Sequence, residues 1–167
     1  MTTDTEARIT KSAWGETPGR QKVDLYRLDN GQIMVSIATY GGMLVDLKVP
    51  DRDGKTANVI RGMDRLEDYF SRHTGLYGSI VGRYGNRIKG GRFVLDGKTY
   101  LLPVNSQGNT LHGGPIGFDQ RVWTAKSRDG RAPSLTLSYT SLDGEMNFPG
   151  TLKTQVRYTL SGGDLSV

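Results

Sequence analysis

The sequence predicts an all-β protein folded as an antiparallel β-sandwich, and three features of the chain lead to this expectation. Apolar and polar residues alternate in short runs, turn-forming residues separate the runs, and helical periodicity is nearly absent. In the clearest run, Leu135, Leu137 and Tyr139 alternate with serine and threonine, which places one face in a core and the other in water. Short strands in such an order favour a sandwich or a barrel-like sheet system.

The first half of the chain predicts a hairpin, a further strand and one helical turn. The hairpin joins an alternating run, with Val23, Leu25 and Arg27 on one face, to a second run across an Asp-Asn-Gly turn. A single helical turn over residues 64–70 would begin at Asp64 as its cap. The expected strands here are Gln21–Leu28, Ile33–Ala38 and Met43–Val49, the last ended by Pro50 and the turn Asp51–Gly54.

The second half predicts a tight hairpin and three longer strands. Asp96-Gly97 is a dipeptide that favours a type I′ two-residue turn, and it separates two strand-like runs. The expected strands are Arg92–Leu95, Lys98–Leu102, Val122–Ala125, Ser134–Thr140 and Leu152–Leu160.

A single domain is expected over residues 9–167, preceded by a polar, frayed tail at residues 1–8. Leu165-Ser166-Val167 restarts the alternation after a turn, and a strand of three residues leaves the preceding strand with an incompletely covered edge. The pattern therefore predicts a truncated or partial domain.

Composition excludes several functional classes. The chain has no cysteine, which rules out disulfides and thiolate metal sites and fits a cytoplasmic protein. The net charge is +5, but lysine and arginine are scattered among acidic residues, so no nucleic-acid partner is expected. No apolar run approaches the ~20 residues of a membrane span, so no membrane association is expected. No metal-ligand spacing is present, and no cofactor is expected.

The chain offers two histidines for proton transfer near neutral pH. His73 lies in a polar stretch and is interpreted as an exposed bystander. His112 lies in Asn-Thr-Leu-His-Gly-Gly, where the glycines allow unusual backbone dihedral angles and close approach of a ligand. From the residues alone, both a binding role and an incidental position remain open for His112.

Three motifs together resemble the aldose 1-epimerases, or galactose mutarotases. They are Gly82-Arg83-Tyr84-Gly85-Asn86-Arg87-Ile88, the hairpin from Gly91 to Gly97, and Asn109 through His112-Gly113-Gly114 with Gly117-Phe118-Asp119 and Val122-Trp123. The framework of Tyr40-Gly41-Gly42, residues 49–54 and Asn147-Phe148-Pro149-Gly150 is also similar. The resemblance implies a β-supersandwich enzyme that interconverts the α and β anomers of free hexoses without metal or cofactor.

By motif position, the resemblance assigns substrate-binding roles to Asn86, Arg87 and His112. The arginine would hydrogen-bond sugar oxygens as a fork of several donors, and the histidine would bind near the reacting end of the sugar. Of the neighbouring residues, Arg83 and Arg121 are expected to be structural. Phe118 and Trp123 are expected to belong to the core or the pocket wall.

The chain also departs from the family pattern. In the family, the general acid is a histidine of a later Thr-Asn-His strand, a substrate-binding aspartate follows, and the general base is a glutamate near the C-terminus. No residue of the 167 matches these motifs, and Glu145 belongs to a different loop, so we expect no catalytic residues and negligible activity from this chain alone. It is interpreted as an N-terminal portion that binds a hexose and lacks a C-terminal portion.

Alternative interpretations remain open at this level. The chain could be a carbohydrate-binding module without catalysis, or half of a split enzyme. A relative acting on sugar phosphates would require additional basic residues around the pocket.

Overall fold

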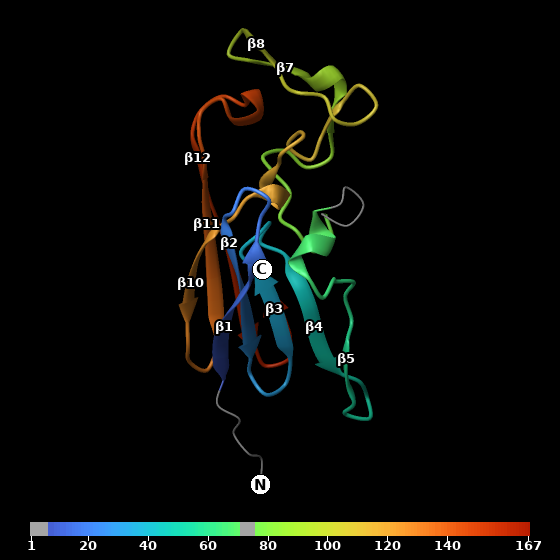
Figure 1. Ribbon diagram of the computed structural model, residues 1–167, viewed down its shortest axis with the longest axis vertical. Helices are drawn as coiled ribbons and strands as arrows, with labels where there is room; N and C mark the ends of the chain where they lie inside the picture. The colour runs from blue at the N-terminus through green and yellow to red at the C-terminus, as the bar shows by residue number, and fades with distance from the viewer. Residues whose placement is uncertain (1–6, 71–75) are drawn as a thin grey trace.

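The computed structural model describes residues 7–70 and 76–167 (Figure 1). Strands and short 3₁₀ turns make up its regular structure, and none of the helices described is long and apolar enough to cross a membrane. The strands are β1 (Arg8–Glu16), β2 (Lys22–Asp29), β3 (Met34–Ala38), β4 (Leu44–Pro50), β5 (Thr56–Asn58), β6 (Arg87–Ile88), β7 (Arg92–Leu95), β8 (Lys98–Leu101), β9 (Thr110–Leu111), β10 (Thr124–Arg128), β11 (Ser134–Ser141), β12 (Leu152–Ser161) and β13 (Asp164–Ser166). The 3₁₀ turns are Leu66–Tyr69, Lys89–Gly91, Phe118–Gln120 and Glu145–Asn147.

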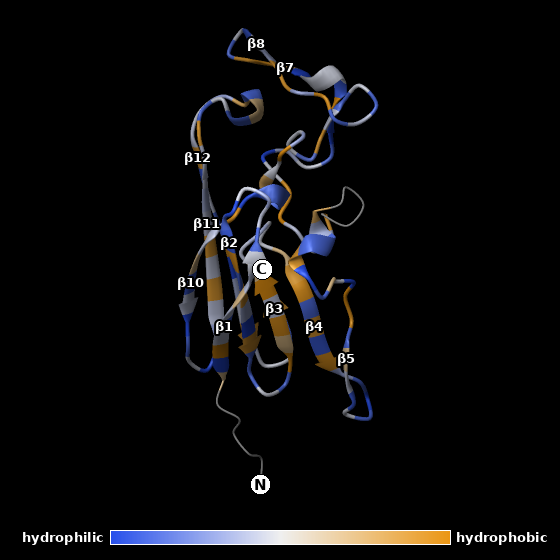
Figure 2. Ribbon diagram, viewed as in Figure 1, coloured by the Kyte–Doolittle hydropathy of each residue, from blue (hydrophilic) through white to orange (hydrophobic). Residues whose placement is uncertain are grey.

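Two antiparallel sheets form the sandwich that the sequence predicts. One has the order β1-β2-β3-β4-β5 and the other the order β10-β11-β12-β13. Their facing side chains share one core, in which Leu28 and Ile37 of the first sheet join Leu137 and Leu160 of the second. Apolar and polar residues alternate along β4 and β11, as expected for strands with one face in a core (Figure 2). The prediction of an all-β antiparallel sandwich is thus confirmed.

A second apolar cluster covers the outer face of the first sheet. The 3₁₀ turn Leu66–Tyr69 packs Leu66 and Tyr69 there against Val23 and Met43. Strand β2 therefore packs apolar side chains on both faces, with Val23 in this cluster and Tyr26 and Leu28 in the core between the sheets. The helical turn expected over residues 64–70 exists as a 3₁₀ turn, but its cap position is Arg65, without a side-chain cap bond, so the prediction that Asp64 caps it was wrong.

The hairpin predicted around Asp96-Gly97 is present as β7 and β8, and both central residues have the positive φ of a type I′ turn, 51° and 74°. Strand β1 was not anticipated, because its side chains are mostly exposed and show no apolar alternation. It is held by backbone pairing with β2, and the pairing begins at Arg8, inside the tail expected at residues 1–8. Residues 1–6 of that tail lie outside the described residues.

Beyond the sandwich, the segment from residue 82 to residue 121 runs to the end of the molecule that lies away from the start of β1 (Figure 1). It contains two small ladders, β6 with β9 and β7 with β8. The three residues assigned to sugar binding lie in this segment: Arg87 belongs to the first of these ladders, and Asn86 and His112 lie directly beside it.

Candidate functional site

The β6–β9 ladder brings Asn86 and Arg87 beside His112, although 25 residues or more separate them in sequence. The pairing continues past the end of β9, where the His112 N–H donates to the Asn86 carbonyl oxygen over 3.0 Å. In return, the Asn86 N–H donates to Nδ1 of the His112 ring, also over 3.0 Å. The two residues have φ angles of 63° and 51°, a left-handed conformation that asparagine and histidine adopt more readily than most residues.

The hydrogen bond from Asn86 defines the state of the histidine ring. Because Nδ1 of His112 accepts a hydrogen bond from the Asn86 N–H, the neutral imidazole carries its own hydrogen on Nε2. The half-buried ring therefore has Nε2–H as its remaining donor. This group is suited to hydrogen-bonding a hydroxyl or ether oxygen.

Arg87 and Asn86 are both exposed, and Nη1 of the arginine donates to Oδ1 of the asparagine over 3.4 Å. Arg87 also lines an open pocket of about 710 Å³ between residues 83–95 and the loop at residues 148–152. Within the described part of the chain, Asn86 and His112 do not line this pocket. The structure thus brings the three predicted ligands together, but only Arg87 contributes to the pocket wall.

The pocket wall contains groups that sequence reasoning did not single out. Lys89 adds a further cation two residues after Arg87, and the half-exposed Tyr84 adds an aromatic surface. Phe93 and Phe148, whose rings stack with centroids 6.3 Å apart, come from opposite sides of the pocket. Only the i, i+2 spacing of Arg87 and Lys89 could have indicated the cation pair.

Two glycines allow the segments of the site to approach closely. A Cβ on Gly113 would lie 1.8 Å from the Gly82 carbonyl oxygen, and one on Gly82 would lie 2.3 Å from the Phe118 ring. Gly113 also has a φ of 86°. Larger residues would therefore push the segment that follows His112 away from the segment that carries Asn86.

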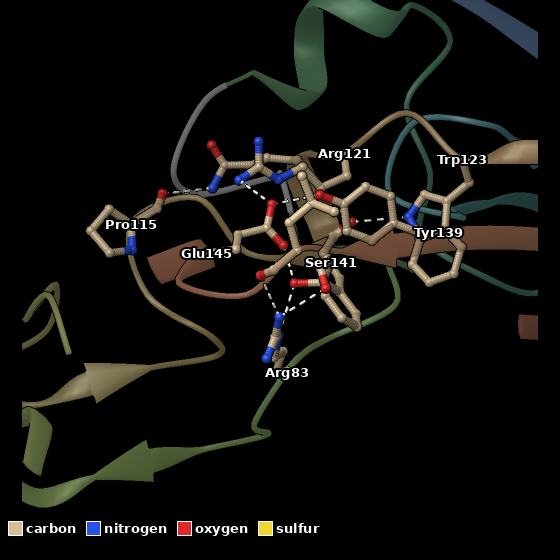
Figure 3. A network of polar contacts seen from close by, with 10 residues as sticks. Arg83, Pro115, Arg121, Trp123, Tyr139, Ser141 and Glu145 are labelled. Atoms are coloured by element: carbon tan, nitrogen blue, oxygen red, sulfur yellow. Dashed lines mark hydrogen bonds and ion pairs between the residues drawn. The ribbon is translucent and has the colours of Figure 1, made fainter. Parts of the chain in front are cut away.

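Phe118 and Trp123 are buried core residues with their rings in edge contact, as expected. Arg83 and Arg121 are structural, also as expected, because each guanidinium is held by hydrogen bonds or an ion pair (Figure 3). Their shared partner is a polar network around Glu145.

Asp119 is a buried acid that the sequence did not single out. It follows Phe118 in a 3₁₀ turn and is 7% exposed. Burial raises the pKa of its carboxyl group above 3.8, while backbone and Gln120 hydrogen bonds and the nearby His112 and Arg121 oppose that shift. No sequence signal distinguishes such a residue from an ordinary acidic loop residue.

Among the described residues, no group of three or more histidine, cysteine or acidic side chains is arranged to hold a metal ion. His73, interpreted as an exposed bystander, lies outside the described residues. The candidate site therefore rests on Asn86, Arg87, His112 and their surroundings.

A model of the family described as aldose 1-epimerase matches residues 24–167 of this chain. The chain belongs to the aldose 1-epimerase family. The galactose mutarotase of Rattus norvegicus is 41% identical to it over 160 residues, which cover 95% of this chain and 46% of that protein. The aldose 1-epimerase of Escherichia coli is 36% identical over 140 residues, 81% of this chain and 40% of the relative.

Solved structures of the aldose 1-epimerase family have the same fold. The galactose 1-epimerase of Lactobacillus acidophilus matches with a TM-score of 0.79 and 27% identity, over 93% of this chain and 45% of that one. A Caenorhabditis elegans homologue of the aldose epimerases matches with a TM-score of 0.72 and 26% identity, over 93% and 42%. The chain thus spans about half the length of the relatives it matches.

Proposed function

We propose that this chain supplies the sugar-binding half of an aldose 1-epimerase site, with a free hexose such as galactose or glucose as substrate. The observation that carries the proposal is the reciprocal pairing of Asn86 and His112 beside Arg87. It gathers the guanidinium donors of Arg87, an amide and an imidazole N–H at one exposed edge. Such a set matches the hydroxyl, ring and anomeric oxygens of a hexose.

The proposed reaction needs one base and one acid. The base removes the proton of the C1 hydroxyl while the acid protonates the ring oxygen, so that the bond between C1 and the ring oxygen breaks and an aldehyde forms. Rotation about the C1–C2 bond presents the other face of the aldehyde, and the reverse proton transfers close the ring to the other anomer. In this scheme, Arg87, Asn86 and His112 hold the sugar oxygens while the proton-transfer groups act.

We assign the acid and the base to residues outside these 167. Glu145 is a poor candidate for the base, because its two carboxylate oxygens already accept from Tyr139, Ser141 and Arg121. Asp119 is enclosed in the 3₁₀ turn Phe118–Gln120, away from bulk water. The chain alone is therefore expected to bind a hexose without accelerating mutarotation.

Two measurements on the purified 167-residue chain test this assignment. Polarimetry with α-galactose should show anomer equilibration at the buffer rate. A galactose titration followed by NMR should move the Asn86 amide, the Arg87 side-chain Nε–H and the His112 ring signals. Equilibration well above the buffer rate would contradict the assignment of the catalytic pair, and silent site signals would contradict the binding role.

Arg87→Ala should weaken galactose binding by about tenfold or more. A hydrogen bond that involves a charged group contributes about 1.5–3 kcal/mol, and about 1.4 kcal/mol corresponds to a tenfold change in Kd. Arg131→Ala is the matched control, because Arg131 is an exposed arginine in the connection between β10 and β11, outside the site. Equal Kd values for the Arg87 variant and the wild type would exclude Arg87 as a ligand.

Lys89 supports a second candidate substrate, a hexose phosphate. It lines the same pocket as Arg87 and supplies the additional cation that a phosphate would require. Parallel titrations with galactose and glucose 6-phosphate separate the two candidates. Tighter binding of the phosphate that disappears in Lys89→Gln would favour the second candidate, whereas equal or tighter binding of galactose would favour the first.

A further inference from the structure

We propose that Glu145 is a positioning residue that fixes both chain segments carrying the proposed sugar-binding residues. It does so through two series of polar contacts, each containing one arginine and each called an arm below. One arm leads through Ser141 to Arg83 and the Asn86–Arg87 segment. The other leads through Arg121 to the segment that follows His112. The inference rests on the proposed sugar-binding role of these residues.

The first arm begins at Arg83, three residues before Asn86. Its Nε donates to Ser141 Oγ over 2.8 Å, and its Nη1 donates to the Pro149 carbonyl oxygen over 3.0 Å. Its Nη2 donates to the carbonyl oxygens of Ser141 and Leu142 over 2.9 and 2.7 Å. Every nitrogen of the guanidinium is thus bound to the end of β11 or to the loop that follows it. Figure 3 shows the bonds of Arg83 at the Ser141 end of β11. Because the donors of a guanidinium form a rigid planar fork, bonds from all three nitrogens restrict the orientation of the Arg83 side chain as well as its position.

Glu145 holds Ser141 in the orientation that this arm needs. The Ser141 hydroxyl donates to Glu145 Oε2, so its oxygen lone pairs face Arg83 Nε. Ser141 is fully buried, which leaves its hydroxyl no water to bond with instead. Without the carboxylate, the hydroxyl proton could turn toward Arg83 and oppose the donor there.

The second arm runs through Arg121. Its Nη2 lies 2.8 Å from Glu145 Oε1, with the side chains of the pair only 27% and 16% exposed. The Arg121 N–H donates to the Phe118 carbonyl oxygen over 3.3 Å, and the Phe118 N–H donates to the Gly82 carbonyl oxygen over 3.2 Å. Arg121 therefore anchors a turn that lies against Gly82. Because Gly82 directly precedes Arg83, the second arm ends next to the arginine of the first arm.

Tyr139 provides the third hydrogen-bond donor to the Glu145 carboxylate. Its hydroxyl donates to Oε1 over 2.5 Å, and burial followed by this hydrogen bond raises the pKa of Tyr139 to about 12. The phenol therefore stays a donor throughout the neutral range. Three donors therefore use most of the roughly four acceptor sites of the carboxylate, which fits a positioning role better than that of a general base.

The test uses the tautomer of the His112 imidazole to report whether Asn86 and His112 keep their relative position. In the wild-type chain, the ¹⁵N shifts of the imidazole should show the tautomer with hydrogen on Nε2, because Nδ1 accepts from Asn86. Glu145→Gln turns one acceptor into a donor and removes the charge between the arms. We expect a mixture of tautomers, loss of protection of the Asn86 amide against hydrogen exchange, and a rise in the galactose Kd of about fivefold if the binding-competent fraction falls to roughly one fifth.

Two further variants keep the inference testable if Glu145→Gln does not fold. Tyr139→Phe removes one donor and keeps the ring that packs against Phe118 and Trp123, so it should shift the same signals less. Arg83→Lys breaks the first arm, because a single ammonium group cannot replace the several donors of the guanidinium. It should change the His112 tautomer signals and the Asn86 amide protection as much as Glu145→Gln does. Glu67→Gln, the same change at an exposed carboxylate, is the matched control and should leave every signal in place.

The outcomes separate this inference from the proposed function. If the variants are less stable but keep the His112 tautomer, the Asn86 protection and the galactose Kd, the network is merely structural and the inference fails. If the tautomer changes as expected while the wild-type chain binds no galactose, the positioning role stands and the proposed function fails. Unchanged signals in all three network variants would also overturn the inference.

Discussion

Two of the three candidate ligands have a backbone conformation that most side chains would resist. Asn86 and His112 both have positive φ angles, and each completes a hydrogen bond with the other. The motifs containing these residues could be found in the sequence, and the glycines after His112 indicated unusual dihedral angles. Their mutual hydrogen bonds could not be predicted, because they depend on a ladder that joins residues 87 and 111. The same holds for Asp119, whose burial follows from packing around it.

Asp119 should make the stability of the fold depend on pH. Its pKa is raised in the folded state by burial, so folding favours the protonated acid. The corresponding contribution to stability is complete below the ordinary pKa of 3.8 and is lost as the pH rises through the raised folded value. We expect the difference in the free energy of unfolding between wild type and Asp119→Asn to fall as the pH rises through this window.

The measurement is denaturant unfolding of both proteins at a series of pH values. Asparagine matches the neutral acid in shape, so the variant should lack this part of the dependence. A difference that stays constant with pH would show that the hydrogen bonds of Asp119 and the charges of His112 and Arg121 balance the effect of burial, and one that grows as the pH rises would show that they outweigh it.

Among the elements, β12 is paired with a neighbouring strand on only one side over much of its length, whereas β11 is paired on both sides. Its first residues pair on one side with β11, while β13 pairs with it only at Thr159, Leu160 and Ser161. In the described part of the chain, the stretch 153–157 therefore has one open edge. The partial coverage expected from Leu165-Ser166-Val167 is found here, and the exposed Lys153 and Arg157 are the kind of charged residues that blunt such an edge.

Hydrogen exchange should show this open edge directly. In an antiparallel strand, alternate residues direct their N–H groups to opposite sides, so one alternate set in residues 153–157 faces β11 and the other faces outward. We expect the outward set to exchange quickly and the other set slowly. Residues 134–138 of β11, which are paired on both sides, provide the internal control and should exchange slowly throughout. Protection of both sets in β12 would mean that another strand covers the edge.

At the scale of the whole molecule, one hydrogen bond joins the second sheet to a turn of the first. The buried hydroxyl of Tyr158 on β12 donates to the carbonyl oxygen of Gly42 over 2.7 Å, across 116 residues of sequence. Burial raises the pKa of Tyr158 to about 12, so the hydroxyl remains a donor at any pH near neutrality. The bond adds a directional contact to a core that is otherwise held by apolar packing.

Tyr158→Phe should lower the free energy of unfolding by about 1–3 kcal/mol, because the buried Gly42 carbonyl oxygen would lose its partner. Denaturant unfolding measures the change. Tyr100→Phe, at a half-buried tyrosine of the separate β7–β8 hairpin, is the control and should have a smaller effect. Equal losses in the two variants would mean that the bond between sheets contributes nothing specific.

The sequence by itself determined the all-β class, most strands, the type I′ hairpin and the family motifs, because these depend on side-chain alternation and on residues close together in the chain. It missed β1, whose exposed side chains carry no alternation, and the short ladder of β6 and β9. Tertiary structure alone decided that Asn86 and His112 bond to each other and that Glu145 joins two arginine arms. These contacts join residues far apart in sequence, so their geometry is set by how the two sheets and their connections pack, which no local pattern encodes.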